Sequence, residues 1–233
     1  MLFILFVIFI VIYYVIKNIL EIKEDYNNYY KLNDFSNIIP LGDHCAIPLI
    51  LKELDIRKKS YPFDWYVKDG SNISESNIEL NINLLYDLLD GIPASQVTNK
   101  LLGNSISQQT TVYNNVWFPH EHGSIEDVNT KYTKRFERVL SDIKNKDNIN
   151  LFIILTRKCY IKQEFIDNFY LKIMNLNKDN RIIFISGINH EYLYNHNYPN
   201  LEFKYIDYDI SKYEKYDYTD FRPQIKSFLQ SKM

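Results

Sequence analysis

Cysteine is scarce in this chain, and the metal-binding signatures that contain it are absent. Only two cysteines, Cys45 and Cys159, occur among 233 residues. Small secreted domains depend on closely spaced cysteines, so a disulfide-built fold is excluded. No Cys-x-x-Cys or His-Glu-x-x-His pattern occurs either, which removes two common zinc signatures. We therefore expect reduced thiols in a reducing compartment.

Long runs of like charge and glycine-rich loops are also missing. The 27 Lys and Arg residues are scattered among 29 Asp and Glu residues, which leaves a net charge of -2. Without a basic stripe to follow phosphates, we expect no nucleic acid partner. Among only six glycines, the one candidate glycine turn, residues 186–189, lacks the spacing of a nucleotide-binding fingerprint. We expect no cofactor.

One long apolar run is present, at the N-terminus. Residues 2–16 are all Leu, Phe, Ile, Val or Tyr, and Lys17 is the first charge. Extended to Leu20, the run has about the 20 residues that a helix needs to cross about 30 Å of hydrocarbon. It lacks the basic start and the small-residue cleavage site of a signal peptide, so we expect a single-pass transmembrane anchor over residues 1–20. A buried core helix is the alternative. Lys17 and Lys23 follow the span, which favours a cytosolic domain.

The remaining sequence predicts a stalk over residues 21–36, an α/β domain over 37–215 and a C-terminal tail over 216–233. Apolar runs predict strands at 38–41, 110–118, 150–156, 181–186 and 201–206. Helical periodicity predicts helices at 46–54, 77–89, 129–145 and 163–175, whereas residues 91–107 lack a firm period. Buried strands that alternate with helices indicate a central, mostly parallel sheet with helices on both faces.

Cys45 follows an apolar run that breaks at Gly42, and a helical pattern begins directly behind it. This spacing predicts a cysteine at a helix N-terminus, where unpaired N–H groups and the helix dipole favour negative charge. A pKa lowered from about 8.5 to about 6 would raise the thiolate fraction at pH 7 from roughly 3% to roughly 90%. Cys45 is therefore a candidate nucleophile, with a small buried hydrophobe as the alternative. Cys159 lacks such a turn, and we expect it to be structural.

A cysteine nucleophile needs a base. His44 is adjacent in sequence, but at a helix start its side chain would point about 100° away from Cys45, so it is poorly placed to take the thiol proton. His120 follows the aromatic pair Trp117-Phe118, which indicates a partly buried setting, and it is our expected base. Alternatively, His120 and His122 would bind zinc together with Cys45 or His44.

Two further segments carry candidate supporting residues. Residues 61–65, Tyr-Pro-Phe-Asp-Trp, combine a rigid turn, large aromatics and one carboxylate. Asp64 either caps this turn within a core plug, or it orients the histidine or fixes the loop that carries Cys45. Arg135 and Arg138 stand one helical turn apart, either on a solvated face or as a joint grip on a carboxylate of Asp64 or of a substrate.

The ordered motifs Leu41-Gly42-x-x-Cys45, Tyr61-Pro62-Phe63-Asp64-Trp65, Phe118-x-His120 and Arg135-x-x-Arg138 resemble those of a known family. That family is described as papain-like cysteine peptidases, a domain of unknown function found in bacteria and large DNA viruses. The likeness covers about residues 37–186. It implies that Cys45 is the nucleophile and His120 its partner, and that a peptide or isopeptide bond is the target.

We expect Gly42, His44, Trp65, Arg135 and Arg138 to bind the substrate or to support the catalytic residues. Papain's Cys-Gly-Ser-Cys-Trp neighbourhood is absent, and the alternating strands and helices after His120 are unlike its antiparallel barrel.

Together these observations predict a membrane-anchored thiol hydrolase for a peptide or other acyl substrate. Cys45 would attack the acyl carbon, and His120 would take the thiol proton and return it to the leaving group. Asp64 would orient or support His120. The alternative is a catalytically silent, membrane-tethered interaction domain.

Overall fold

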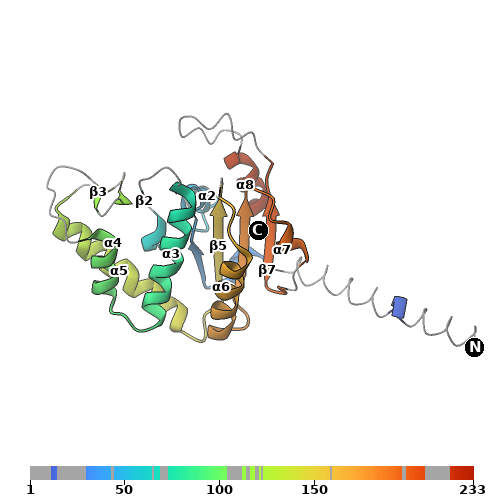
Figure 1. The fold of residues 1–233 in the computed structure, drawn as a ribbon, viewed down its shortest axis with the longest axis horizontal. Coiled ribbons are helices and arrows are strands. Elements are labelled where there is room, and N and C mark those ends of the chain that lie inside the picture. Colours follow the sequence, from blue (N-terminus) through green and yellow to red (C-terminus); the bar gives the residue numbers. More distant parts are fainter. Residues whose placement is uncertain are drawn as a thin grey trace, which may run out of the picture.

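The computed structural model describes residues 12–14, 30–42, 45–64, 66–68, 73–103, 112–113, 116–118, 121, 123–157, 159–195, 198–207 and 221–233. From residue 30 onward the elements follow in the order η1 (Leu32–Asp34), β1 (Asn37–Pro40), α2 (Ala46–Glu53), η2 (Pro62–Asp64), β2 (Val67–Lys68), α3 (Ile73–Leu89), α4 (Ala94–Leu102), β3 (Val112–Tyr113), β4 (Val116–Trp117), α5 (Ile125–Lys144), β5 (Asn150–Thr156), α6 (Gln163–Leu176), β6 (Arg181–Ser186), α7 (Glu191–Asn195), β7 (Leu201–Tyr205) and α8 (Phe221–Gln230). Figure 1 shows the helices packed around a central sheet.

The main sheet has four strands in the order β1-β5-β6-β7, and every neighbouring pair is parallel. The predicted strands 150–156 and 181–186 match β5 and β6 residue for residue. All seven residues of β5 are buried, as expected for a strand covered on both faces. The prediction of an α/β fold with a parallel sheet is therefore confirmed.

Successive residues of the central strand β5 serve two separate apolar clusters. Phe152 and Ile154 pack with residues of α3, α4, α5 and α6, which lie on one face. Leu151, Ile153 and Leu155 pack with residues of α2 and α8, which lie on the other. Helices thus cover both faces, and α3 and α6 lie in front of the sheet in Figure 1.

A second, smaller sheet lies beside this layered core. Its strands are antiparallel in the order β2-β4-β3, and Val112 pairs with Trp117. The single strand predicted over 110–118 is therefore wrong, because two short strands pair with each other there. Between them the sequence reads Asn114-Asn115, residue types that favour turns over extended strand.

The core extends beyond the expected domain limits at residues 37 and 215. Apolar residues from 30–35 and from α8 belong to the cluster that covers the α2 face of the sheet, namely Tyr30, Leu32, Phe35, Phe221, Ile225 and Leu229. The backbone N–H of Leu32 donates to the carbonyl of Lys232, so the two ends of the domain meet. The end of the expected stalk and much of the expected tail are thus parts of the fold.

The described residues contain no helix that is long and apolar enough to cross a membrane. Of the anchor expected over residues 1–20, the described part is residues 12–14, which are helical and exposed.

Candidate functional site

The candidate site lies at the carboxyl edge of the sheet, where β1 and β5 end side by side. These strands are parallel neighbours, so the residues after Pro40 and after Thr156 emerge at the same edge. The next helix after β1, α2, packs on one face of the sheet, whereas α6 follows β5 onto the other. In open α/β sheets, ligands bind at such a carboxyl edge, where neighbouring connections leave toward opposite faces.

Gly42 allows the chain after β1 to pass very close to β5. A Cβ atom added there would lie 2.9 Å from the Cβ of Leu155 and 3.3 Å from its carbonyl oxygen. The Gly42 carbonyl accepts a hydrogen bond from Nδ2 of Asn81 at 2.9 Å, and the Tyr66 hydroxyl donates to Oδ1 of Asn81. All three residues are buried. This network fixes the start of the segment that ends at Cys45.

Cys45 is the N-cap residue of α2, so the predicted place of this cysteine at a helix start is confirmed. The thiol is partly buried, and neither cysteine forms a disulfide. Burial raises the pKa of the Cys45 thiol above its ordinary value, and the carboxylate of Asp64 acts in the same direction. A backbone N–H and the charge of Arg157 oppose this rise without cancelling it. The predicted lowering of the thiol pKa is therefore wrong, because burial outweighs the helix start.

Asp64 lies in the short helix η2 and is fully buried. Its Oδ2 accepts hydrogen bonds from the Arg57 guanidinium at 2.5 Å and from the backbone N–H of Tyr61 at 2.9 Å. Among the described residues, none donates a hydrogen bond to its Oδ1. Burial raises the pKa of Asp64 to about 6, although the Arg57 charge pulls it down. One oxygen thus caps the turn, while the other remains available to a further donor.

The segment around His120 is anchored to α5 on both sides of this residue. Phe118 is fully buried, and its ring meets that of Tyr132 edge to face at 5.1 Å. Glu121 is also buried, and its Oε1 accepts from the Arg135 guanidinium at 3.1 Å. Arg135 in turn lies over the Tyr132 ring, 4.9 Å from its centroid.

The two arginines of α5 have separate partners within the protein and do not jointly hold Asp64. Arg135 is buried and pairs with Glu121 rather than binding Asp64 directly. Arg138 is exposed and donates to the carbonyl of Ser60 at 2.7 Å. The predicted joint grip on Asp64 is therefore wrong, whereas a joint grip on a substrate carboxylate stays a prediction.

Several predicted site residues lie outside the described residues, namely His44, Trp65, His120 and His122. Within the described part of the chain, no three His, Cys, Asp or Glu residues are grouped so as to hold a metal ion. Cys159 packs against the core, and its backbone N–H and carbonyl both bond to the Thr156 hydroxyl. Its predicted structural role is consistent with these contacts.

Sequence reasoning missed Asn81, Glu121 and Arg157. Asn81 lies three positions after Ile78 on the apolar face of a predicted helix, and a polar residue there signals a buried hydrogen-bonding role. Arg157 follows β5 directly and is buried at the same edge as Cys45. No comparable signal in the sequence marks Glu121, which lies in a loop and finds its partner Arg135 on α5.

Comparisons with family models, curated proteins and solved structures found no match for this chain.

Proposed function

We propose that this protein is a cysteine hydrolase that acts on an acyl substrate, with a peptide or isopeptide bond as the principal target. One observation carries the proposal. Asp64 is a buried carboxylate with one oxygen that finds no hydrogen-bond donor in the described part of the chain, and its charge raises the pKa of the Cys45 thiol. Cysteine and serine hydrolases use such a carboxylate to hold the histidine that accepts the nucleophile's proton.

His120 is the proposed base. Its sequence neighbours Phe118 and Glu121 are held against Tyr132 and Arg135. The positive charge of Arg135 lowers the pKa of Asp64, and the Asp64 carboxylate adds to the burial that raises the pKa of Tyr132. The carboxylate and the anchored segment therefore share one electrostatic neighbourhood. A histidine that donates to Oδ1 of Asp64 would satisfy the orphaned oxygen and fix the orientation of its own ring.

The proposed reaction begins with transfer of the thiol proton from Cys45 to His120 as sulfur attacks the acyl carbon. The negative oxygen of the tetrahedral intermediate is stabilised by backbone N–H groups at the start of α2. His120 then returns the proton to the leaving group, and water releases the acyl group from sulfur. Because burial raises the thiol pKa, the base must act during attack rather than meet a preformed thiolate.

Acyl transfer from p-nitrophenyl acetate to Cys45, followed by mass spectrometry and nitrophenol release, tests the proposal. We expect acetylation at Cys45 in the Cys159→Ser chain and none in the Cys45→Ser chain. His120→Ala should slow it by about 100-fold or more, the usual contribution of a general base. His196→Ala is the matched control and should leave the rate unchanged. Equal rates in the two histidine variants would refute the proposed base.

A second candidate function is a catalytically silent interaction domain. The raised thiol pKa favours it, because buried structural cysteines are protonated and inert. In that case Cys45 and Cys159 should react with iodoacetamide equally slowly near pH 6.5. Much faster reaction of Cys45 would exclude this candidate.

We further propose that residues 1–20 anchor the domain to a membrane as a single span, with the domain on the cytosolic side. The support is the unbroken apolar run 2–16 and the lysines that follow it. The chain should then remain with membranes during alkaline carbonate extraction, and deletion of residues 2–20 should release it. Protease applied to sealed vesicles reports the orientation.

A further inference from the structure

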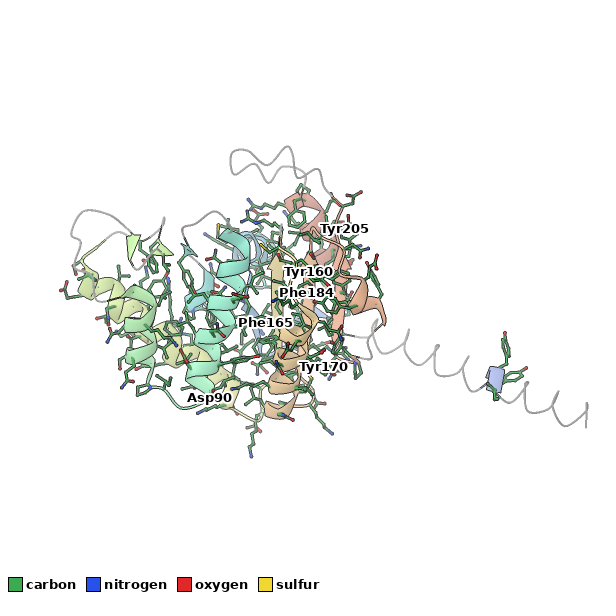
Figure 2. All side chains as sticks on the ribbon, in the orientation of Figure 1. Asp90, Tyr160, Phe165, Tyr170, Phe184 and Tyr205 are labelled. Carbon is green, nitrogen blue, oxygen red and sulfur yellow. The ribbon has the colours of Figure 1, made fainter. Side chains whose placement is uncertain are left out.

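A cavity of about 240 Å³ lies between α3 and the start of α6. It is lined by Glu79 from α3 and by residues of the β5–α6 connection and of α6, namely Tyr160, Ile161, Lys162, Glu164, Phe165 and Asn168. Tyr160 and Phe165 lie on the side of the sheet that α3 and α6 cover (Figure 2). Sites for whole small molecules span roughly 300–1,000 Å³, so this smaller cavity suits a single side chain of a larger ligand.

Tyr160 provides a rigid aromatic wall. Its ring stacks on the ring of His190, with centroids 5.0 Å apart and planes 6° apart, yet the residue is 54% exposed. Nε2 of His190 accepts from the backbone N–H of Ile161 at 3.0 Å, and Nδ1 bonds to the carbonyl of Ile188 at 2.9 Å. These two bonds require a neutral imidazole with its proton on Nδ1. The ring beneath Tyr160 therefore adds no positive charge that would repel a cation.

The connection that carries Tyr160 is held in place from two sides. Besides the bond to His190, the Ile161 carbonyl accepts a hydrogen bond from the Tyr192 hydroxyl at 2.8 Å. Ile161 is itself buried. The aromatic wall is thus preformed, which lowers the ordering cost of binding.

The charges around the cavity favour a cation. Glu79 and Glu164 are both exposed, and neither carboxylate forms a hydrogen bond or an ion pair with another described residue. Lys162 contributes one opposing positive charge, which leaves an acidic balance. Aromatic rings attract ammonium and guanidinium groups through their faces, so Tyr160 acts in the same direction as the two carboxylates.

Both walls of the cavity belong to segments that also carry a residue acting near Cys45. Glu79 stands two positions before Asn81, which bonds to the Gly42 carbonyl. Tyr160 stands three positions after Arg157, whose charge acts on the Cys45 thiol. β1 and β5 are parallel neighbours, so the connection that carries Tyr160 leaves the same edge of the sheet as the segment that ends at Cys45.

We propose that this cavity binds the basic side chain of a lysine or arginine residue in a polypeptide substrate. The subsite role rests on the proposed function, whereas the binding of the cation does not. The substrate class is thus narrowed to polypeptides that carry a basic residue near the bond that Cys45 attacks.

The test measures binding to the full chain in nonionic detergent, with the Cys45→Ser substitution to prevent turnover. The probes are N-acetyl-lysine N-methylamide and N-acetyl-norleucine N-methylamide, which differ in the terminal ammonium group. We expect the lysine probe to bind about fivefold or more tightly than the norleucine probe. Tyr160→Leu and Glu79→Gln should each weaken the lysine probe by about two- to fivefold, and Lys162→Gln should strengthen it.

Glu126→Gln on α5 is the matched control and should change nothing. Equal binding of the two probes, or an equal loss in Glu79→Gln and Glu126→Gln, would overturn the inference. Failure of the two proposals can be told apart. A lysine-selective cavity in a chain whose Cys45 is never acetylated would remove the hydrolase and keep the cation site. Acetylation of Cys45 without lysine selectivity would do the reverse.

Discussion

Asp64 offers the sharpest quantitative test, because burial shifts its pKa in a direction that costs stability. The pKa rises from an ordinary value of 3.8 to about 6, and each pKa unit corresponds to about 1.4 kcal/mol. The side chain is fully buried, so solvent does not screen this cost. Ionised Asp64 therefore destabilises the folded state by about 3 kcal/mol relative to its protonated form.

The sign of the pH dependence follows from proton counts. Between about pH 4 and pH 6 the folded state keeps a proton on Asp64 that the unfolded state has lost. The contribution of Asp64 to the free energy of unfolding should then fall by about 3 kcal/mol across this window as the pH rises, and stay level above it. Asp64→Asn removes this contribution while other titrating groups remain.

Urea unfolding of the full chain in nonionic detergent, from pH 3.5 to 7.5, measures the effect. We expect the stability of the wild type minus that of Asp64→Asn to decrease with rising pH, whatever its absolute value. Arg57→Gln removes the charge that holds the Asp64 pKa down, so the decrease should then extend above pH 6. A difference that is flat or rises with pH would refute the reasoning.

Three further perturbations test other parts of the site. Gly42→Ala should destabilise the protein by about 1–3 kcal/mol in the same unfolding assay, because its Cβ would overlap Leu155. Asn81→Ala leaves the Gly42 carbonyl and the Tyr66 hydroxyl without a partner and should cost about 2–5 kcal/mol, with Tyr66→Phe costing less; equal costs would contradict the network. Burial lowers the pKa of His190, so its contribution to stability should fall as pH drops below about 6.5. The stability of the wild type minus that of His190→Gln should therefore decrease from pH 7 to pH 5, and a difference that stays flat over this range would contradict the prediction.

The layered fold was readable because its strands and main helices carry strong local signals. β5 and β6 are continuous apolar runs, as strands buried on both faces must be. Helix α8 was missed because its apolar residues form only a narrow face, Phe221, Ile225 and Leu229. These three residues are buried because α8 packs against α2 and joins one apolar cluster with Tyr30, and both lie far away in the sequence.

The site was predictable in position but not in energetics. The turn at Gly42 correctly indicated that Cys45 begins a helix, since a local pattern determines this. The sign of the thiol pKa shift depends on burial by distant segments, which no local pattern reveals. The partner of Arg135 could not be predicted from the sequence either. Only the packing of α5 against the segment around residue 121 distinguishes Glu121 from the other carboxylates.

Burial of Cys45 and Asp64 together constrains how the proposed hydrolase would respond to pH. Near pH 7 the Asp64 carboxylate is ionised, because its pKa is about 6, while burial keeps the Cys45 thiol protonated. A proton must therefore leave the thiol in each turnover, and only a base that Asp64 orients in its ionised form can accept it. Activity should rise with pH through about 6 in the wild type. In Asp64→Asn that rise should be lost along with most of the rate, whereas a mechanism that starts from a preformed thiolate would keep both.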